Sequence, residues 1–377
     1  MDSSFIQVKN WLLDSGIFVS KSDNENYGGV YSYFDEEKKA FSFLYPEITG
    51  YYASTMRFLY SHDDQIDYVN RAKSSCNWLA KLFDSNGGII QAIYPNAKSL
   101  PFVYSFDTAI CAKGMFDCYK ISNDEKYLKY GKKFNRWIIN NALNSNGTIK
   151  PLYNLESQKF EPSTDVWYKQ YGCLHIKLTM SLLSEYSITG EKPLLEYAKN
   201  IANQIINFQN DDGSIRLHLD DKVINLHTMC YALEGLLFLY YFTNNEKYLD
   251  YCMNTLQWFD EQINSDGSID LWFNSKYHSK SSYPIAQIIR LKILISKINN
   301  LSKKTLPNLM NFLISLQATD TNSIVKGGFY EEFHKSLFSW KKRLKVNSWA
   351  SMFALQALYW NDNISKINFE QEIDLLY

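Results

Sequence analysis

The sequence has no excess of charge of either sign and no long apolar run. Its 39 lysines and arginines are matched by 40 aspartates and glutamates, so it lacks the basic character of a nucleic-acid-binding protein. No segment approaches the roughly eighteen consecutive apolar residues of a membrane-spanning helix. Nucleic acid is therefore excluded as a partner, and we expect no membrane span.

The sequence also lacks paired cysteines and a secretory start. None of its six cysteines forms a Cys-x-x-Cys pair, and the opening MDSSFIQVKNW has no basic region followed by an apolar one. Reduced thiols and a cytoplasmic location are expected. Cys173 and His175 lie two residues apart in a helical pattern and so point to different faces of a helix. We therefore expect no metal and no cofactor.

A glycine turn recurs six times and reveals an internal repeat. In segments such as NSNGTIKPLY and NSDGSIDLWF, polar residues precede the glycine and a β-branched residue follows it. This pattern predicts a tight turn that enters a short extended segment. The marker glycines follow one another at steps of 59, 59, 66, 54 and 61 residues: Gly29, Gly88, Gly147, Gly213, Gly267 and Gly328.

Two helical patterns lie between successive turns, and together they predict a closed ring. The first of each pair is apolar on nearly every side, as in LHTMCYALEGLLFLYYF, and the second is amphipathic, as in YLDYCMNTLQWFDEQI. The N-terminal SSFIQVKNWLLDSG supplies the sixth amphipathic helix and closes the ring. The prediction is an all-α, closed (α/α)6 barrel with short β-hairpin-like loops at one end, a single domain over 1–377. An open superhelix would leave the apolar SWASMFALQALYW without cover.

The long connections from outer to inner helices mark the expected site. Each carries a glycine turn, a short strand and aromatic residues, whereas the connections at the other end, such as ISNDEKY, are short and alike. Loops on a rigid scaffold commonly carry sites, and six helix N-termini converge at this end. The Asp63–Asp67 stretch resembles the Mg²⁺-binding motif of terpene synthases, but it falls at the other end and is read as a solvated helix start.

The candidate site residues lie at or near the starts of the inner helices. Each also has a structural explanation, since first-turn acids cap helices and tryptophans fill cores. The candidate catalytic residues are Glu47, Asp107, Asp165 and His227. The candidate substrate-binding residues are Tyr51, Trp167, Tyr168, Tyr231, Arg290, Tyr330, Asn347 and Trp349.

Arg290 is the one arginine in an otherwise apolar helix, and a buried guanidinium needs an anionic partner. That partner is either Glu234 of the neighbouring inner helix or a carboxylate or phosphate of the substrate. The sequence leaves both open. It also leaves the oligomeric state open.

Carboxylates, a histidine and aromatic residues on one rim suit glycosidic chemistry, which uses an acid, a base and a stacking surface. Hydrolysis or elimination on an acidic or amino sugar of a bacterial glycan is the favoured function. The alternatives are an epimerase, which needs a base for a carbon-bound proton, and a non-catalytic glycan-binding protein. The expected partner is a saccharide, free or linked to a nucleotide or lipid.

The six-hairpin pattern resembles the (α/α)6 carbohydrate-active superfamily. Resemblance to its unsaturated glucuronyl hydrolases implies an acid/base role for Asp107 and Asp165. Resemblance to its N-acylglucosamine 2-epimerases implies proton transfer by His227 and His175, although His175 is expected one turn deeper in its helix.

Two further resemblances concern short phrases. YPEITGY, FDTAI and NSWASMFALQAL resemble toroid proteins associated with bacterial surface-polysaccharide synthesis. FQNDDGSI is similar to repeats of squalene cyclases and protein prenyltransferases, which makes a terpene or prenyl enzyme a further alternative.

Overall fold

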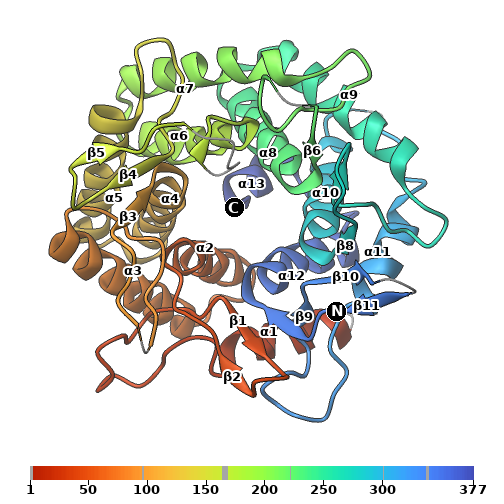
Figure 1. The fold of residues 1–377 in the computed structure, drawn as a ribbon, viewed down its shortest axis with the longest axis horizontal. Coiled ribbons are helices and arrows are strands. Elements are labelled where there is room, and N and C mark those ends of the chain that lie inside the picture. Colours follow the sequence, from red (N-terminus) through yellow and green to blue (C-terminus); the bar gives the residue numbers. More distant parts are fainter. Residues whose placement is uncertain (1–2, 96, 164–168, 221, 300, 337–338) are drawn as a thin grey trace.

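The helical hairpins form a ring (Figure 1). The computed structural model describes residues 3–95, 97–163, 169–220, 222–299, 301–336 and 339–377. Within these ranges an inner layer of helices surrounds the axis and an outer layer wraps around it, which confirms the predicted (α/α)6 barrel.

The inner layer consists of the apolar helices. In α8, for example, every residue from Thr228 to Leu239 is buried, because one side faces the outer layer and the others face the neighbouring inner helices and the axis. The inner helices are α2 (Pro46–Asp63), α4 (Ser105–Ser122), α6 (Leu178–Thr189), α8 (Leu226–Thr243), α10 (Ser282–Ile295) and α12 (Ser348–Asp362).

The outer layer consists of the amphipathic helices, each with one apolar face on the inner layer. Phe83 of α3 and Phe134 of α5 stack with ring centroids 4.6 Å apart, which joins two neighbouring outer helices. The outer helices are α1 (Ser3–Asp14), α3 (Ile66–Asn86), α5 (Glu125–Trp137), α7 (Lys192–Ile205), α9 (Glu246–Gln262) and α11 (Leu306–Ser315).

The N-terminal helix α1 lies beside the last inner helix, α12. Phe5 and Tyr359 have ring centroids 5.4 Å apart, and the Trp11 indole donates a hydrogen bond of 2.7 Å to the carbonyl oxygen of Ile324. The first and last hairpins are thus joined, and α12 has the cover that an open superhelix would not give it.

The repeated glycine turns hold each hairpin against the next. Gly213 has φ 89° and Gly267 has φ 83°, a left-handed conformation that favours glycine. A Cβ at Gly213 would lie 2.5 Å from the carbonyl oxygen of Asn254 on α9, and one at Gly267 would lie 2.0 Å from that of Asn308 on α11. At these two turns glycine is required because the turn touches the backbone of the following outer helix, whereas the turn at Gly87 and Gly88 makes no such contact.

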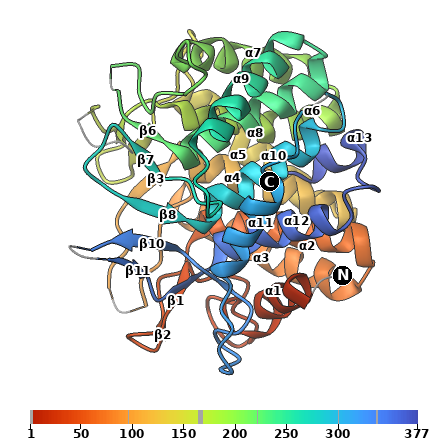
Figure 2. The same cartoon turned by 90° about the vertical axis from the view of Figure 1, so that its right-hand side faces the viewer.

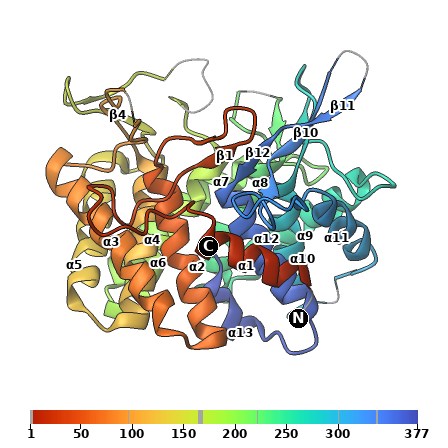
Figure 3. The ribbon, with the colours of Figure 1, turned by 90° about the horizontal axis from the view of Figure 1, so that it is seen from below.

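Short strands gather at one end of the barrel (Figures 2 and 3). Several lead directly into an inner helix, so they fix where that helix begins. The strands are β1 (Tyr33–Asp35), β2 (Ala40–Phe41), β3 (Phe102–Tyr104), β4 (Leu152–Asn154), β5 (Lys159–Phe160), β6 (Ile224–Asn225), β7 (Trp272–Phe273), β8 (Ser279–Ser281), β9 (Phe329–Tyr330), β10 (Glu332–Lys335), β11 (Trp340–Lys342) and β12 (Lys345–Asn347). Antiparallel pairing gives the sheets β2-β1-β12-β9, β11-β10-β8, β3-β4-β5 and β6-β7.

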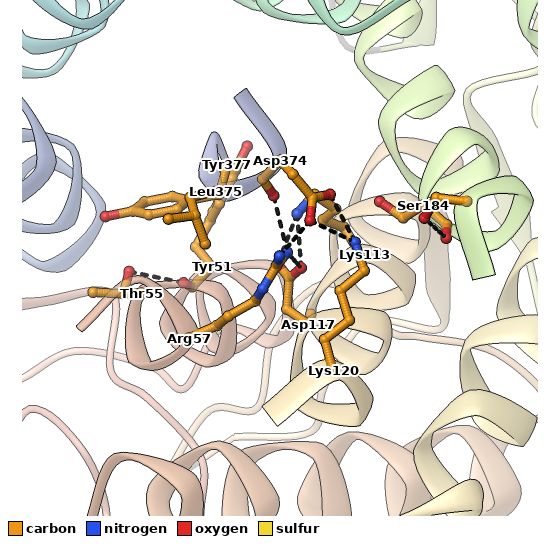
Figure 4. A network of polar contacts seen from close by, with 12 residues as sticks. Tyr51, Thr55, Arg57, Lys113, Asp117, Lys120, Ser184, Asp374, Leu375 and Tyr377 are labelled. Carbon is orange, nitrogen blue, oxygen red and sulfur yellow. Dashed lines mark hydrogen bonds and ion pairs between the residues drawn. The ribbon is translucent and has the colours of Figure 1, made fainter. Parts of the chain in front are cut away.

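The last residues of the chain close the opposite end of the barrel. Helix α13 (Phe369–Glu372) and the 3-10 turn after it (Ile373–Leu375) pack against α2, α8 and α10. Asp374 pairs with Arg57 and, at 2.7 Å, with Lys120, while Arg57 also lies 2.7 Å from Asp117 (Figure 4). This ion-pair network joins the C-terminal plug, formed by α13 and the 3-10 turn after it, to α2 and α4. Access to the barrel interior is therefore from the strand-bearing end.

Candidate active site

A cavity of about 290 Å³ lies inside the ring, where the inner helices begin. Most of its walls are first-turn residues of these helices or residues just before them, because the short strands stop at this level. The lining residues are Tyr45, Glu47, Ile48, Gln91, Tyr104, Phe106, Asp107, Pro151, Leu174, His175, His227, Thr228, Tyr231, Tyr283 and Trp349.

Two carboxyl groups share this cavity. Glu47 belongs to the first turn of α2 and Asp107 to the first turn of α4, and both are buried. Neither helix has a side-chain cap from its N-cap residue, and the Oδ2 atom of Asp107 has no hydrogen-bond partner among the described residues. A buried carboxyl oxygen left without a partner is costly, so Asp107 is suited to meet a donor or to carry a proton.

The environment separates the proton affinities of the two carboxyls. Burial raises the pKa of Glu47 to about 7, although a hydrogen bond with Tyr45 and the charge of Lys177 lower it in part. Burial, together with the nearby charge of Glu47, raises the pKa of Asp107 well above its usual range. Burial therefore favours the protonated form of Asp107, while Glu47 is the carboxyl that titrates near neutral pH.

His227 also lies in the cavity wall, in the first turn of α8. Its Nδ1 lies 2.5 Å from Oε1 of Gln287, while Nε2 of Gln287 donates to Oε1 of Glu234 at 3.1 Å. An amide whose nitrogen donates to Glu234 must accept through its oxygen, so Nδ1 of His227 carries the hydrogen. Burial lowers the pKa of His227 to about 3, so the imidazole is neutral and Nε2 has a free lone pair.

His175 reaches the same cavity because its helical segment begins later than the sequence pattern implies. A 3-10 turn (Cys173–Lys177) precedes α6, and His175 lies in this first turn rather than one turn deeper. Its Nδ1 lies 3.1 Å from the amide nitrogen and 3.0 Å from the carbonyl oxygen of Gly172, and its ring stacks on Tyr171. Burial lowers the pKa of His175 to about 4.

A buried ion cluster supports these side chains. Glu234 of α8 accepts from Lys177 and from Arg290, and all three side chains are almost completely buried. The ammonium of Lys177 also lies 4.5 Å from the ring centroid of Tyr231 and 5.2 Å from that of Tyr51. The cluster packs beneath Tyr231 at the bottom of the cavity and joins three inner helices.

Several of the predicted residues are brought together in the cavity wall. Glu47, Asp107, His227, Tyr231 and Trp349 all line it. The predicted Asp165, Trp167 and Tyr168 lie outside the described residues.

Four other predicted residues lie elsewhere. Arg290 is fully buried and binds Glu234, Gln356 and the carbonyl oxygen of Tyr377, so the pairing with Glu234 is the alternative observed. Tyr51 lies beneath the cavity, packed on Phe353 with ring centroids 5.3 Å apart, because it is one turn further along α2 than Glu47. Asn347 is buried as the cap of α12 and accepts from the amide of Ala350.

Tyr330 is the fourth, a buried residue of β9 under the side chain of Lys342. Neither Tyr330 nor Asn347 is among the described residues that line the cavity.

Sequence reasoning missed part of the aromatic wall. Tyr45 and Tyr104 line the cavity, and each is the residue immediately before an inner helix. Tyr283 reaches it from the first turn of α10. The signal for them is the shared position of Tyr45 and Tyr104 in successive repeats, each directly before an inner helix. Lys177 was not predicted, because it is a single lysine in a mostly apolar helix and hydrophobic periodicity gives no signal for it.

In the described ranges, no helix is long and apolar enough to cross a membrane. Within the same residues, no group of three or more histidine, cysteine, aspartate or glutamate side chains is arranged to hold a metal ion.

No protein-family model matches the sequence, and no curated protein sequence matches it. Solved structures do match the fold. Cellobiose 2-epimerase from Bacillus thermoamylovorans B4167 has a TM-score of 0.78 and 12% identity over 97% of this chain and all of its own. A D-mannose isomerase has a TM-score of 0.76 and 11% identity, over 97% of this chain and 100% of its own.

The unsaturated glucuronyl hydrolase from Bacillus sp. GL1 has a TM-score of 0.70 and 12% identity, over 95% of this chain and 97% of its own. Identities this low show the fold alone. The chain has the (α/α)6-barrel fold that also occurs in carbohydrate epimerases, isomerases and glycoside hydrolases.

Proposed function

We propose that this protein is a carbohydrate-active enzyme that cleaves a glycosidic bond by general acid/base catalysis. The observation that carries the proposal is the pair of buried carboxyls, Glu47 and Asp107, in one cavity with different proton affinities. A protonated acid beside an ionisable base is the arrangement that glycoside hydrolysis requires.

In the proposed reaction Asp107 is the acid and Glu47 the base. Asp107 gives its proton to the glycosidic oxygen as the bond to the anomeric carbon breaks. Glu47 takes a proton from the water molecule that attacks that carbon, so the products are a new reducing end and a free hydroxyl group. The pKa of Glu47, raised by burial to about 7, suits a base that works near neutral pH.

The rest of the wall suits a sugar ring. Tyr45, Tyr104, Tyr231, Tyr283 and Trp349 give aromatic faces and hydroxyl groups around the two acids. Sugar rings present apolar C–H faces and polar edges, and aromatic side chains with a polar end match both. The proposed partner is therefore a saccharide, whether free or linked to a larger carrier.

A glycan screen in water enriched with ¹⁸O tests this proposal. Purified protein is incubated with a panel of oligosaccharides, and products are analysed by mass spectrometry. Hydrolysis is expected to place one ¹⁸O atom in the new reducing end, and Asp107→Asn is expected to abolish it. An unsaturated product without ¹⁸O would show elimination instead, and binding without any product would favour a glycan-binding protein.

A second candidate function is epimerisation of a sugar, and one observation favours it. His175 and His227 line the same cavity, so two neutral imidazoles would face a sugar ring bound there. The fold match to cellobiose 2-epimerase is consistent with this candidate but does not establish it. Incubation of cellobiose or mannose in D₂O distinguishes the two functions, because epimerisation exchanges a carbon-bound hydrogen for deuterium and glycoside hydrolysis does not.

A further inference from the structure

The cavity opens beside a second, larger hollow at the strand-bearing end of the barrel. This outer groove, of about 780 Å³, is lined by residues of β7, of the β7–β8 connection and of β10, including Trp272, Lys276, Tyr277, His278 and Lys335. Tyr283 lines both the groove and the inner cavity, so the two are adjacent. Figure 2 shows β7, β8, β10 and β11 together at this end.

The groove and the cavity differ in charge. Among the described residues, the cavity wall holds two carboxyls and neither lysine nor arginine. The groove holds Lys276, Lys335 and Arg343 against Glu331 and Glu332. None of the residues outside the described ranges is a lysine or an arginine.

The carboxylates of the groove are already occupied. Arg343 lies 3.0 Å from Glu332 and 3.6 Å from Glu331, and the Ser281 hydroxyl donates to Glu332 at 3.0 Å. No described carboxylate lies within ion-pair distance of Lys276 or Lys335, and both side chains belong to exposed residues. Two cations are therefore free to meet an anionic ligand.

The groove also has an exposed stacking surface. Tyr277 is 61% exposed, and its ring centroid lies 6.4 Å from that of Trp272. The ammonium of Lys276 lies 5.6 Å from the Tyr277 ring. An exposed tyrosine with a lysine over one face of its ring can stack a sugar ring on its other face and bind a carboxylate of the same ligand.

The size of the inner cavity makes an outer binding site necessary for a chain. At about 290 Å³ it lies just below the range of about 300–1,000 Å³ for ligand pockets. It holds one sugar unit rather than several. Units attached to that sugar on the side of Tyr283 would enter the groove.

We propose that the groove binds the continuing part of an acidic oligosaccharide, with uronate carboxylates on Lys276 and Lys335 and a sugar ring on Tyr277. This rests on the proposed function, because it assigns the cavity to the reacting sugar. Arg290 pairs with Glu234, so we assign the acidic groups of the substrate to the groove and a neutral or amino sugar to the cavity.

Binding measurements with defined oligosaccharides test the proposal, with the full chain and isothermal titration calorimetry. The probes are an oligogalacturonate tetramer, cellotetraose as its neutral counterpart and UDP-glucose as a phosphate-bearing sugar. The acidic tetramer is expected to bind most tightly, and its affinity is expected to fall when salt is added. The affinity for the acidic tetramer is expected to fall by about tenfold in Tyr277→Ala and in the double variant Lys276→Ala, Lys335→Ala.

The controls are exposed residues of the same types away from the groove. Tyr27→Ala and Lys21→Ala should leave all affinities unchanged. Equal binding of the acidic and neutral tetramers, or no effect of the groove variants, would overturn the proposal. Tighter binding of UDP-glucose than of the acidic tetramer would also overturn it, since the anion would then be a pyrophosphate.

The proposal for the groove and the proposed catalysis can be tested independently. The Glu47→Gln and Asp107→Asn variants change residues of the cavity only. In both variants, replacing the groove lysines should still weaken binding of the acidic tetramer. If no glycan is hydrolysed but the lysine variants still weaken binding, the groove stands and the proposed hydrolysis is wrong.

Discussion

His227 and Gln287 face each other across the boundary between α8 and α10, with Nδ1 of the imidazole 2.5 Å from Oε1 of the amide. The amide is itself held by Glu234, which binds two buried cations. Gln287 therefore links the buried ion cluster to a side chain of the cavity wall. It fixes the tautomer of His227 and the direction of the free nitrogen.

The first prediction follows from this link. Gln287→Leu removes the acceptor for Nδ1, so the imidazole is expected to become a mixture of tautomers, observable in the ¹⁵N NMR shifts of His227. Loss of the buried hydrogen bonds should also cost about 1–3 kcal/mol of stability. Gln317→Leu is the matched control, a buried glutamine that binds the carbonyl oxygens of Ser4 and Gly327 outside the site. An unchanged His227 spectrum in Gln287→Leu would contradict the assignment.

The second prediction concerns the pH dependence of catalysis. Glu47 acts as a base only when ionised, and burial raises its pKa to about 7. The rate should therefore rise with pH up to about 7, and it should fall again at the higher pH at which Asp107 loses its proton. Glu47→Gln and Asp107→Asn are each expected to lower kcat by about 100-fold or more. Steady-state kinetics between pH 5 and 9 measure both effects, and a rate that falls as pH rises from 5 to 7 would contradict the role of Glu47.

The third prediction isolates the effect of Tyr45. The hydrogen bond from Tyr45 lowers the pKa of Glu47 against the larger effect of burial. Tyr45→Phe removes only the hydroxyl, so the pKa of Glu47 should rise and the rising limb of the pH–rate profile should move to higher pH. Tyr283→Phe, which loses a hydroxyl elsewhere in the cavity wall, should leave the limb in place. A limb that moves to lower pH in Tyr45→Phe would show that the hydroxyl does not stabilise the carboxylate.

The sequence predicted the ring and the level of the site, because both depend on periodicity. Glycine turns mark where each hairpin begins, so Glu47, Asp107 and His227 could be placed at helix starts from spacing alone. The sequence did not predict how far a side chain lies below the starts of the inner helices. Tyr51 follows Glu47 by one turn and drops beneath the cavity, and Arg290 lies two turns into its helix, where its anion is Glu234.

Local helix geometry was the other limit. His175 reaches the cavity because a 3-10 turn starts its helix at Cys173, and hydrophobic periodicity does not distinguish a 3-10 turn from an α-helix. The plug of α13 was not predicted either. Its attachment depends on Asp374 meeting Arg57 and Lys120, three residues far apart in the sequence whose pairing no local pattern reports.

The fourth prediction concerns stability and pH. The folded state raises the pKa of Glu47 from 4.5 to about 7, so it holds a proton that the unfolded chain releases at lower pH. Stability should therefore fall as pH rises from about 4.5 to 7, by roughly 3 kcal/mol at most from this group. Glu47→Gln cannot ionise and should lose less stability over that range than the wild type does. Urea denaturation at pH 5 and pH 7.5 tests this, with the exposed Glu25→Gln as control.

The fifth prediction tests the close contact that sets α2 beside α4. A Cβ on Gly50 would lie 2.9 Å from the carbonyl oxygen of Ile110 and 2.9 Å from the Cα of Cys111, and backbone atoms in a buried helix cannot move aside. Gly114 makes the reciprocal contact, since its Cβ would lie 2.6 Å from the carbonyl oxygen of Gly50. Gly50→Ala should therefore destabilise the protein by about 1–3 kcal/mol, although alanine favours helices.

The same substitution should affect catalysis, because α2 and α4 carry Glu47 and Asp107. If the helices separate, the charge of Glu47 acts less strongly on Asp107, and the pKa of Asp107 falls toward its usual range. The alkaline limb of the pH–rate profile should then move to lower pH in Gly50→Ala. A variant as stable as the wild type, with an unchanged profile, would show that the two helices tolerate a larger separation than their glycines imply.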